Sequence, residues 1–517
     1  MAALVFFVVL CHEPCSGEAR PWLLLHNLTF AEMIKEVSCN GNGLFFYFLL
    51  YPFVRIGMPP FFMQFLCWLA SSSALFLLYL FSPFPLSLKI VIALSAPFLY
   101  FFPVTSGCFS FVPLLLFLSA LAYPDRRKHP LRYLFPLAFL ANTHFVMTGF
   151  VAAVFFLFYR ENFRNVRTCS GTESRNIIEL MFFSLIVPVA QIVYAVLCND
   201  FVHFSYKEIF KPLAVFFLSF FENLTPFFVS PAYVLPVNMF LMSCCAVVML
   251  LLVFLWKKLK DLAPAMLWVS LFTFFFQLTV YNFLFPFITP DMFFCWHAVL
   301  IFCFWLAMLK PDDFADGDPG LGAVRPGDDA SGTAAIAGQD SVFSHGSDIP
   351  GALNVIQSCG DSKFAFSRQD WSRRSSVILL EILFIATIPS GMFFLSRDIS
   401  GRSSGAADMA SYIKNSLSRE DVVFSASDSV DSLVFALNGR PLLFNNGNKL
   451  AFSGNEGILK CADLYSYSAE GKNVYLVFHE EEEALRYTPV HSSEGALIWK
   501  ENYYLARIYP EREYDEP

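Results

Sequence analysis

Residues 61–81 read FFMQFLCWLASSSALFLLYLF, a run of 21 residues without a single Asp, Glu, Lys or Arg. A helix needs about 20 predominantly apolar residues to cross the roughly 30 Å hydrocarbon core of a bilayer. The whole chain shares this character, because 56% of its 517 residues are hydrophobic, 63 are Phe and only 15% are charged. The sequence therefore predicts an α-helical polytopic membrane protein.

Eleven further apolar segments surround this run. They lie at 1–11, 44–57, 88–104, 108–123, 133–143, 146–159, 176–198, 236–256, 263–283, 289–309 and 376–396. The basic loops at 125–132, 160–175 and 257–260 should all be cytoplasmic, because Lys and Arg concentrate on that side. With the loop at 12–43 outside, the basic loop at 125–132 lies inside only if one of the segments between them does not cross the membrane. The weakest is 44–57, so we interpret it as an interfacial or re-entrant helix. About 11 crossings remain.

The chain divides into four predicted parts. Residues 1–309 form a transmembrane domain whose first extracytoplasmic loop is 12–43, since 1–10 lack the basic start and cleavage site of a signal peptide. Residues 310–375, rich in Gly, Asp, Ala and Ser, form a disordered cytoplasmic loop. The last crossing is 376–396, and 397–517 form a small soluble extracytoplasmic α/β domain. Its expected elements are helices at 406–417 and 430–437 and strands at 421–424, 441–444 and 474–478.

Charged residues are almost absent from the cores of the predicted crossings, which argues against an ion-coupled transporter. No dense basic cluster exists outside short loops, so nucleic acid is not an expected partner. Polar side chains gather instead at the predicted outer edge of the membrane. They are Glu13, Glu18, Arg20, His26, His144, His203, Lys207, Glu208, Asp291 and His297.

A carboxylate at the membrane–water boundary can deprotonate an acceptor hydroxyl or bind a divalent metal while a lipid-linked donor lies in the adjacent leaflet. Each candidate also has a plainer interpretation. Glu18 can be a solvated loop acid, His144 a turn or packing histidine, and His297 a histidine buried one turn into a helix. The residues alone leave these alternatives open.

Three stretches carry a family resemblance in their order and spacing. Residues 12–22 read HEPCSGEARPW, 39–52 read CNGNGLFFYFLLYP and 141–144 read ANTH. They resemble a little-studied bacterial family within the GT-C superfamily of integral-membrane glycosyltransferases, which use polyprenyl-phosphate-linked sugars. That family's first loop typically reads H-E-x-W-R-D-E-A-x-A-W. The matching positions here are His12, Glu13, Glu18, Ala19 and Trp22.

The resemblance implies a GT-C fold and a transferase of the bacterial inner membrane. Such an enzyme moves a sugar from a polyprenyl-phosphate donor to a glycan or lipid acceptor on the extracytoplasmic face. Glu18 would act as the catalytic base or bind a divalent metal, Mg or Mn, and His144 would assist. Other residues would help to bind the donor or substrate, namely Arg20, His26, Lys207 and His297. The C-terminal domain would shape the acceptor entrance.

Several motif residues of that family are replaced in this chain. Gly17 stands where the family has an Asp before its Glu, and Asn40 and Asn42 replace an acid and a histidine. Phe102 and Gly107 stand where a later motif has an acid and an arginine. These changes favour an alternative, a catalytically inactive GT-C-like protein that binds lipid-linked sugar or a partner. A transporter or flippase is a further alternative, although the sequence shows no inverted repeats.

Overall fold

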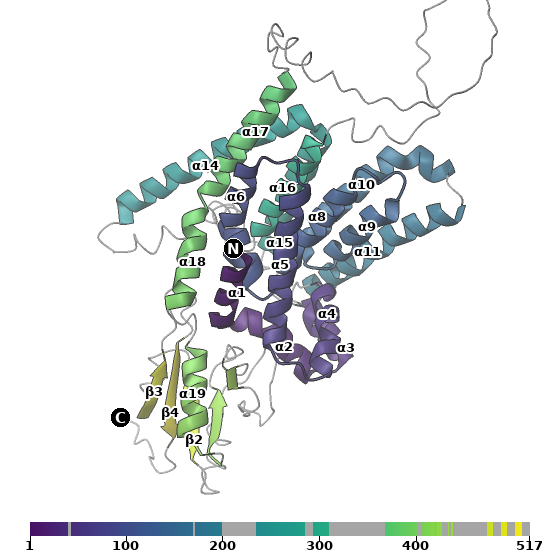
Figure 1. The fold of residues 1–517 in the computed structure, drawn as a ribbon. Coiled ribbons are helices and arrows are strands. Elements are labelled where there is room, and N and C mark those ends of the chain that lie inside the picture. The colour runs from purple at the N-terminus through teal and green to yellow at the C-terminus, as the bar shows by residue number, and fades with distance from the viewer. Residues whose placement is uncertain are drawn as a thin grey trace, which may run out of the picture.

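The computed structural model is a helical bundle with a small sheet beyond one end (Figure 1). The residues that it describes are 1–39, 43–168, 171–198, 234–284, 293–309, 368–400, 405–418, 420–425, 433, 436–437, 473–478, 488–493 and 502–508. Figure 1 places α2, α3 and α4 at the end of the bundle that faces the sheet.

The first helix, α1 (Ala2–Cys11), confirms the first predicted segment. The stretch after it was predicted as a loop, but it folds largely into α2 (Ser16–Asn27) and α3 (Phe30–Cys39). Thr29 and Glu32 explain the start of α3, because the backbone N–H of each donates to the side chain of the other. This reciprocal arrangement is a capping box, which satisfies two N–H groups that a helix start leaves open.

The next helices continue the bundle. They are α4 (Leu44–Arg55), α5 (Phe61–Phe81), α6 (Leu86–Leu94), η1 (Pro97–Phe101), α7 (Phe102–Val104), η2 (Cys108–Phe111), α8 (Val112–Ala122) and α9 (Pro130–Ala141). Two of them, α5 and α7, contact α1. The predicted crossing at 88–104 is broken, because α6 and the helix from Pro97 to Val104 meet at a bend of 64°. The break falls at Ser95, whose backbone is extended, and Pro97 then stands at the start of the next helix, a position that proline favours.

The remaining helices complete the bundle. They are α10 (Phe145–Thr168), α11 (Gly171–Cys198), α14 (Val234–Leu262), α15 (Pro264–Leu284), α16 (Phe294–Met308), α17 (Arg368–Ile385) and α18 (Ile388–Ser400). Every residue of α16 is buried, so this helix lies in the core. α8 starts beside η2 and runs away from it, so the basic loop at 125–132 lies at the opposite end of α8 from η2.

The outer surface of the bundle suits lipid rather than water. Large apolar side chains such as Phe76, Leu197 and Phe275 are exposed on it. Among the described residues, three helices are long and apolar enough to cross a membrane, and the bent pair would make a fourth. Six shorter apolar helices accompany them. The chain is an integral membrane protein, whereas the predicted number of about 11 crossings stays a prediction.

A small α/β unit follows the last bundle helix. It contains α19 (Ala406–Ser416), β1 (Val422–Ser425), β2 (Val474–Phe478), β3 (Thr488–Ser493) and β4 (Tyr503–Ile508). The strand order is β1-β2-β4-β3, in which only β1 and β2 pair in parallel. The strands predicted at 421–424 and 474–478 are confirmed, as is the helix at 406–417. The strand predicted at 441–444, most of the helix at 430–437 and most of the loop at 310–375 lie outside the described residues, and the domain boundaries stay predictions.

Candidate functional site

Glu18 lies in the first turn of α2, where the helix dipole favours a negative side chain. Its carboxylate is turned inward, and the residue is only 7% exposed. His12 follows the last residue of α1 and is equally buried. The Nε2 atom of His12 lies 2.9 Å from Oε2 of Glu18. A carboxylate so removed from water needs such a partner, because a buried unpaired charge is costly.

His12 has a second acidic partner from the other end of the chain. Its Nδ1 atom lies 2.7 Å from Oδ2 of Asp398, on α18. Ionised carboxylates only accept hydrogen bonds, so this geometry requires a proton on both ring nitrogens. Burial by itself lowers the pKa of His12, but attraction by Glu18 and hydrogen bonds with Asp398 and Glu18 raise it to about 10. Glu18, His12 and Asp398 therefore form a carboxylate bridge in which one imidazolium joins two acids.

Neighbouring elements fix this carboxylate bridge in place. The backbone N–H of Ser106 donates to Oε2 of Glu18 at 3.0 Å. From α5, Nε2 of Gln64 donates to the carbonyl of His12 at 3.2 Å. Oε2 of Glu18 thus has two strong donors, whereas Oε1 accepts only the Cys15 thiol at 3.5 Å among the described residues. Because a thiol is a weak donor, Oε1 is the less firmly held of the two carboxylate oxygens.

Two of the stretches that carry the family resemblance meet in space. The N–H of Gly43 donates to the Thr143 carbonyl at 3.1 Å, and the N–H of Phe45 donates to the Asn142 carbonyl at 2.9 Å. The approach is close, because a Cβ atom on Gly43 would lie 2.0 Å from the Asn142 oxygen. The start of α4 and the tip between α9 and α10 are therefore one packed unit.

His144 lies at this hairpin tip, and the structure connects it to the turn beside Glu18. Its ring packs on Phe109 with the centroids 4.6 Å apart, three residues beyond Ser106. Nδ1 of His144 accepts the N–H of Val146 at 3.3 Å. Burial lowers the pKa of His144 to about 3, so the ring is neutral at pH 7. A neutral ring whose Nδ1 accepts a hydrogen bond carries its proton on Nε2, so His144 can only donate from there.

The other predicted binding residues have different surroundings. Arg20 pairs with Glu36 at 2.9 Å, and both are partly exposed. His26 is exposed beside Asn27, with the side chains 3.2 Å apart. His297 is fully buried in α16, with Nδ1 3.2 Å from the Phe293 carbonyl. Lys207 lies outside the described residues. The binding roles of these four residues stay predictions.

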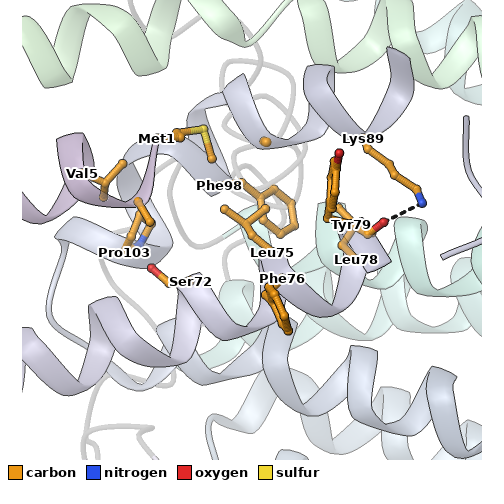
Figure 2. Close-up of a pocket in the computed structure, with 12 residues that line it drawn as sticks. Met1, Val5, Ser72, Leu75, Phe76, Leu78, Tyr79, Lys89, Phe98 and Pro103 are labelled. Carbon is orange, nitrogen blue, oxygen red and sulfur yellow. Dashed lines mark hydrogen bonds between the residues drawn. The ribbon is translucent and has the colours of Figure 1, made fainter. Parts of the chain in front are cut away.

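An apolar groove runs along α1 on the side of α5 and α6. Figure 2 shows its lining, with Val5 and Pro103 at one end, Phe98 between, and Lys89 at the other end. The groove encloses about 260 Å³. At its far end lie Lys89 and Tyr79, and Nζ of Lys89 donates to the Tyr79 carbonyl at 2.8 Å. A hydrocarbon chain fits such a lining better than a sugar does, because the walls offer few hydrogen-bonding groups.

Comparison with solved structures identifies this architecture. ArnT from Cupriavidus metallidurans, a GT-C glycosyltransferase, in its apo state aligns with a TM-score of 0.50 and 11% identity, over 98% of this chain and 96% of that one. The chain has the GT-C fold. ArnT bound to undecaprenyl phosphate aligns less well, with a TM-score of 0.45, 12% identity and the same coverage. The chain matches no protein-family model and no curated protein.

Within this GT-C fold, the replaced motif residues have apolar or open surroundings. Phe102 is buried, with its ring 5.2 Å from that of Phe98. Gly17 and Gly107 have space around them, since a Cβ atom on either would meet nothing within 4 Å. Asn40 and Asn42 lie outside the described residues. Positions 102 and 107, where the family has an acid and an arginine, therefore carry no polar side chain in this chain.

A divalent metal at Glu18 stays a prediction. In the described parts of the chain, no group of three or more His, Cys, Asp or Glu side chains could hold an ion. Mg and Mn prefer several oxygen ligands, but the carboxylates of Glu18 and Asp398 both bond to His12. This donor set does not fit such a cation.

Sequence reasoning did not predict that His12 and Asp398 join Glu18. His12 was quoted as a motif match without a role, and Asp398 lies just after the predicted crossing at 376–396. An available signal was the position of Asp398 itself. A lone acid at the end of the last apolar segment falls at the same membrane edge as the first loop. No spacing rule, however, relates residues that are 386 positions apart.

Proposed function

We propose that the protein is a membrane glycosyltransferase that moves a sugar from a polyprenyl-phosphate-linked donor to an extracytoplasmic glycan or lipid acceptor. The observation that carries this proposal is the state of Glu18. Its carboxylate is buried, bonded to His12 and fixed through Oε2, while Oε1 meets only a weak donor. A base held in one orientation with one open oxygen is what a transfer to a hydroxyl requires.

The reaction needs a single displacement at the anomeric carbon. Oε1 of Glu18 accepts the proton of the acceptor hydroxyl as its oxygen forms a bond to that carbon. The bond from the carbon to the phosphate oxygen breaks, and its electron pair leaves with the polyprenyl phosphate. His12 stays protonated and holds the Glu18 carboxylate in place before the step. His144 donates only from Nε2, which suits a hydrogen bond to a sugar or phosphate oxygen.

The lipid part of the donor is assigned to the apolar groove beside α1. The groove begins at Pro103, three residues before Ser106, whose N–H bonds to Glu18. A prenyl chain lying in it would bury apolar surface at about 25 cal/mol per Å². The sugar would then lie at the Pro103 end of the groove, on the same side as Glu18. The protein would be placed in a bacterial inner membrane with this end extracytoplasmic.

The test is transfer by the purified protein from a panel of polyprenyl-phosphate sugars. Glu18→Gln should lower the rate by about 100-fold to 10,000-fold, because it removes the base and keeps the shape. Glu179→Gln is the matched control, since Glu179 is exposed on α11 and pairs with Arg175. Full activity in Glu18→Gln would show that Glu18 is not the base.

One observation favours a second function, that of an inactive relative which binds lipid-linked sugar. The positions expected to carry an acid and a phosphate-binding arginine are Phe102 and Gly107, and the first is buried among aromatic rings. The same panel separates the two functions. Saturable binding of a polyprenyl-phosphate sugar without turnover, equal in the unmutated protein and in Glu18→Gln, would support the binding function.

A further inference from the structure

Asp398 and Glu18 come from opposite ends of the chain, yet the two share His12. The distances from His12 are 2.9 Å to Glu18 and 2.7 Å to Asp398, and all three side chains are at least nine-tenths buried. A ring held through one nitrogen alone can turn about that contact. A second bond on the other nitrogen fixes the plane of the ring and therefore the direction of its first N–H.

Asp398 itself is held firmly. The hydroxyl of Tyr100 donates to the same Oδ2 atom at 2.7 Å. The Tyr100 ring also stacks on Phe394 of α18, with centroids 5.1 Å apart and planes 19° apart. One turn earlier, a Cβ atom on Gly391 would lie 3.0 Å from the Cα of Ala96, so α18 packs directly against the chain before η1. These contacts leave little freedom in the position of the Asp398 carboxylate.

We infer that Asp398 is a positioning residue: it orients His12, and the oriented His12 fixes Oε2 of Glu18 so that Oε1 faces the acceptor. The role in transfer rests on the proposed function, whereas the fixing of Glu18 does not. The last helix of the bundle, α18, thus contributes a residue that positions Glu18.

The first test measures transfer. Asp398→Asn keeps the size of the side chain and removes its charge, so kcat should fall by about 10-fold to 100-fold while KM for donor and acceptor stays within about 2-fold. Asp398→Glu restores the charge and should recover part of kcat. Ser396→Ala is the matched control, because Ser396 is exposed on the same helix and donates to the Phe393 carbonyl. An unchanged kcat in Asp398→Asn would overturn the role in transfer.

The second test does not depend on activity. A double-mutant cycle of Glu18→Gln and Asp398→Asn is measured by thermal unfolding in detergent, and then repeated in His12→Gln. We expect the two effects to be non-additive in the first background and additive in the second, because the coupling passes through His12. Additive effects in both backgrounds would overturn the inference.

The two failures are distinguishable. Coupling without any transfer by the unmutated protein would refute the proposed function and leave Asp398 as the residue that fixes Glu18. Transfer without coupling would support the proposed function and refute the positioning role of Asp398. If Asp398→Asn does not fold, Asp398→Glu replaces it in the cycle, since it keeps the charge and moves the carboxylate by one methylene.

Discussion

The charge on His12 should make the stability of the protein fall at alkaline pH. Its pKa is raised from 6.5 to about 10 in the folded protein. A raised histidine pKa contributes stability that is fully present below pH 6.5 and is lost as pH rises through about 10. At 1.36 kcal/mol per pKa unit, the shift corresponds to on the order of 5 kcal/mol. At about 1–2 °C per kcal/mol for a long chain, the unfolding temperature should drop by roughly 5–10 °C.

The assay is thermal unfolding in detergent between pH 6 and pH 10.5. His12→Gln should be less stable than the unmutated protein at pH 6, because it leaves two buried carboxylates without their cation. Its unfolding temperature should then change less as pH rises. His26→Gln is the matched control and should keep the full pH dependence, since His26 is exposed. Equal alkaline losses in the unmutated protein and His12→Gln would refute the reasoning.

Two glycine substitutions test the packing that surrounds the site. Gly43→Ala should lower the unfolding temperature strongly, because its Cβ would lie 2.0 Å from the Asn142 oxygen, whereas Gly107→Ala should leave it nearly unchanged, since no atom lies within 4 Å. Gly149→Ala should cost about 1–3 kcal/mol, as overpacking does, because its Cβ would lie 2.4 Å from the Phe276 ring. Thermal unfolding checks each, and a Gly43→Ala protein as stable as Gly107→Ala would contradict the packing described.

The bundle could be predicted from the sequence because its signal is local. An apolar run such as 61–81 predicts both a helix and its lipid surroundings, and α5 begins and ends at those residues. The first loop was less predictable, since 12–43 is mixed in composition and its helices are short. The Thr29–Glu32 spacing is a local capping signal for the start of α3.

The site was only half predictable, for a related physical reason. Glu18 could be found because a polar residue between apolar segments stands out along the chain. Its partners could not, because a buried charge is stabilised by whatever the fold brings near it, and here that is Asp398 from the last helix. The environment of His144 is equally non-local, since its neutral state follows from burial against Phe109.

The carboxylate bridge also changes how the missing acid at Gly17 should be understood. The family resembled by the first loop has an Asp directly before its Glu, so two negative charges lie close together. In this chain the second carboxylate is Asp398, on the opposite side of His12. An imidazolium between two acids makes their burial less costly than that of two adjacent unpaired acids. The loss of one motif acid is therefore compatible with a working base at Glu18.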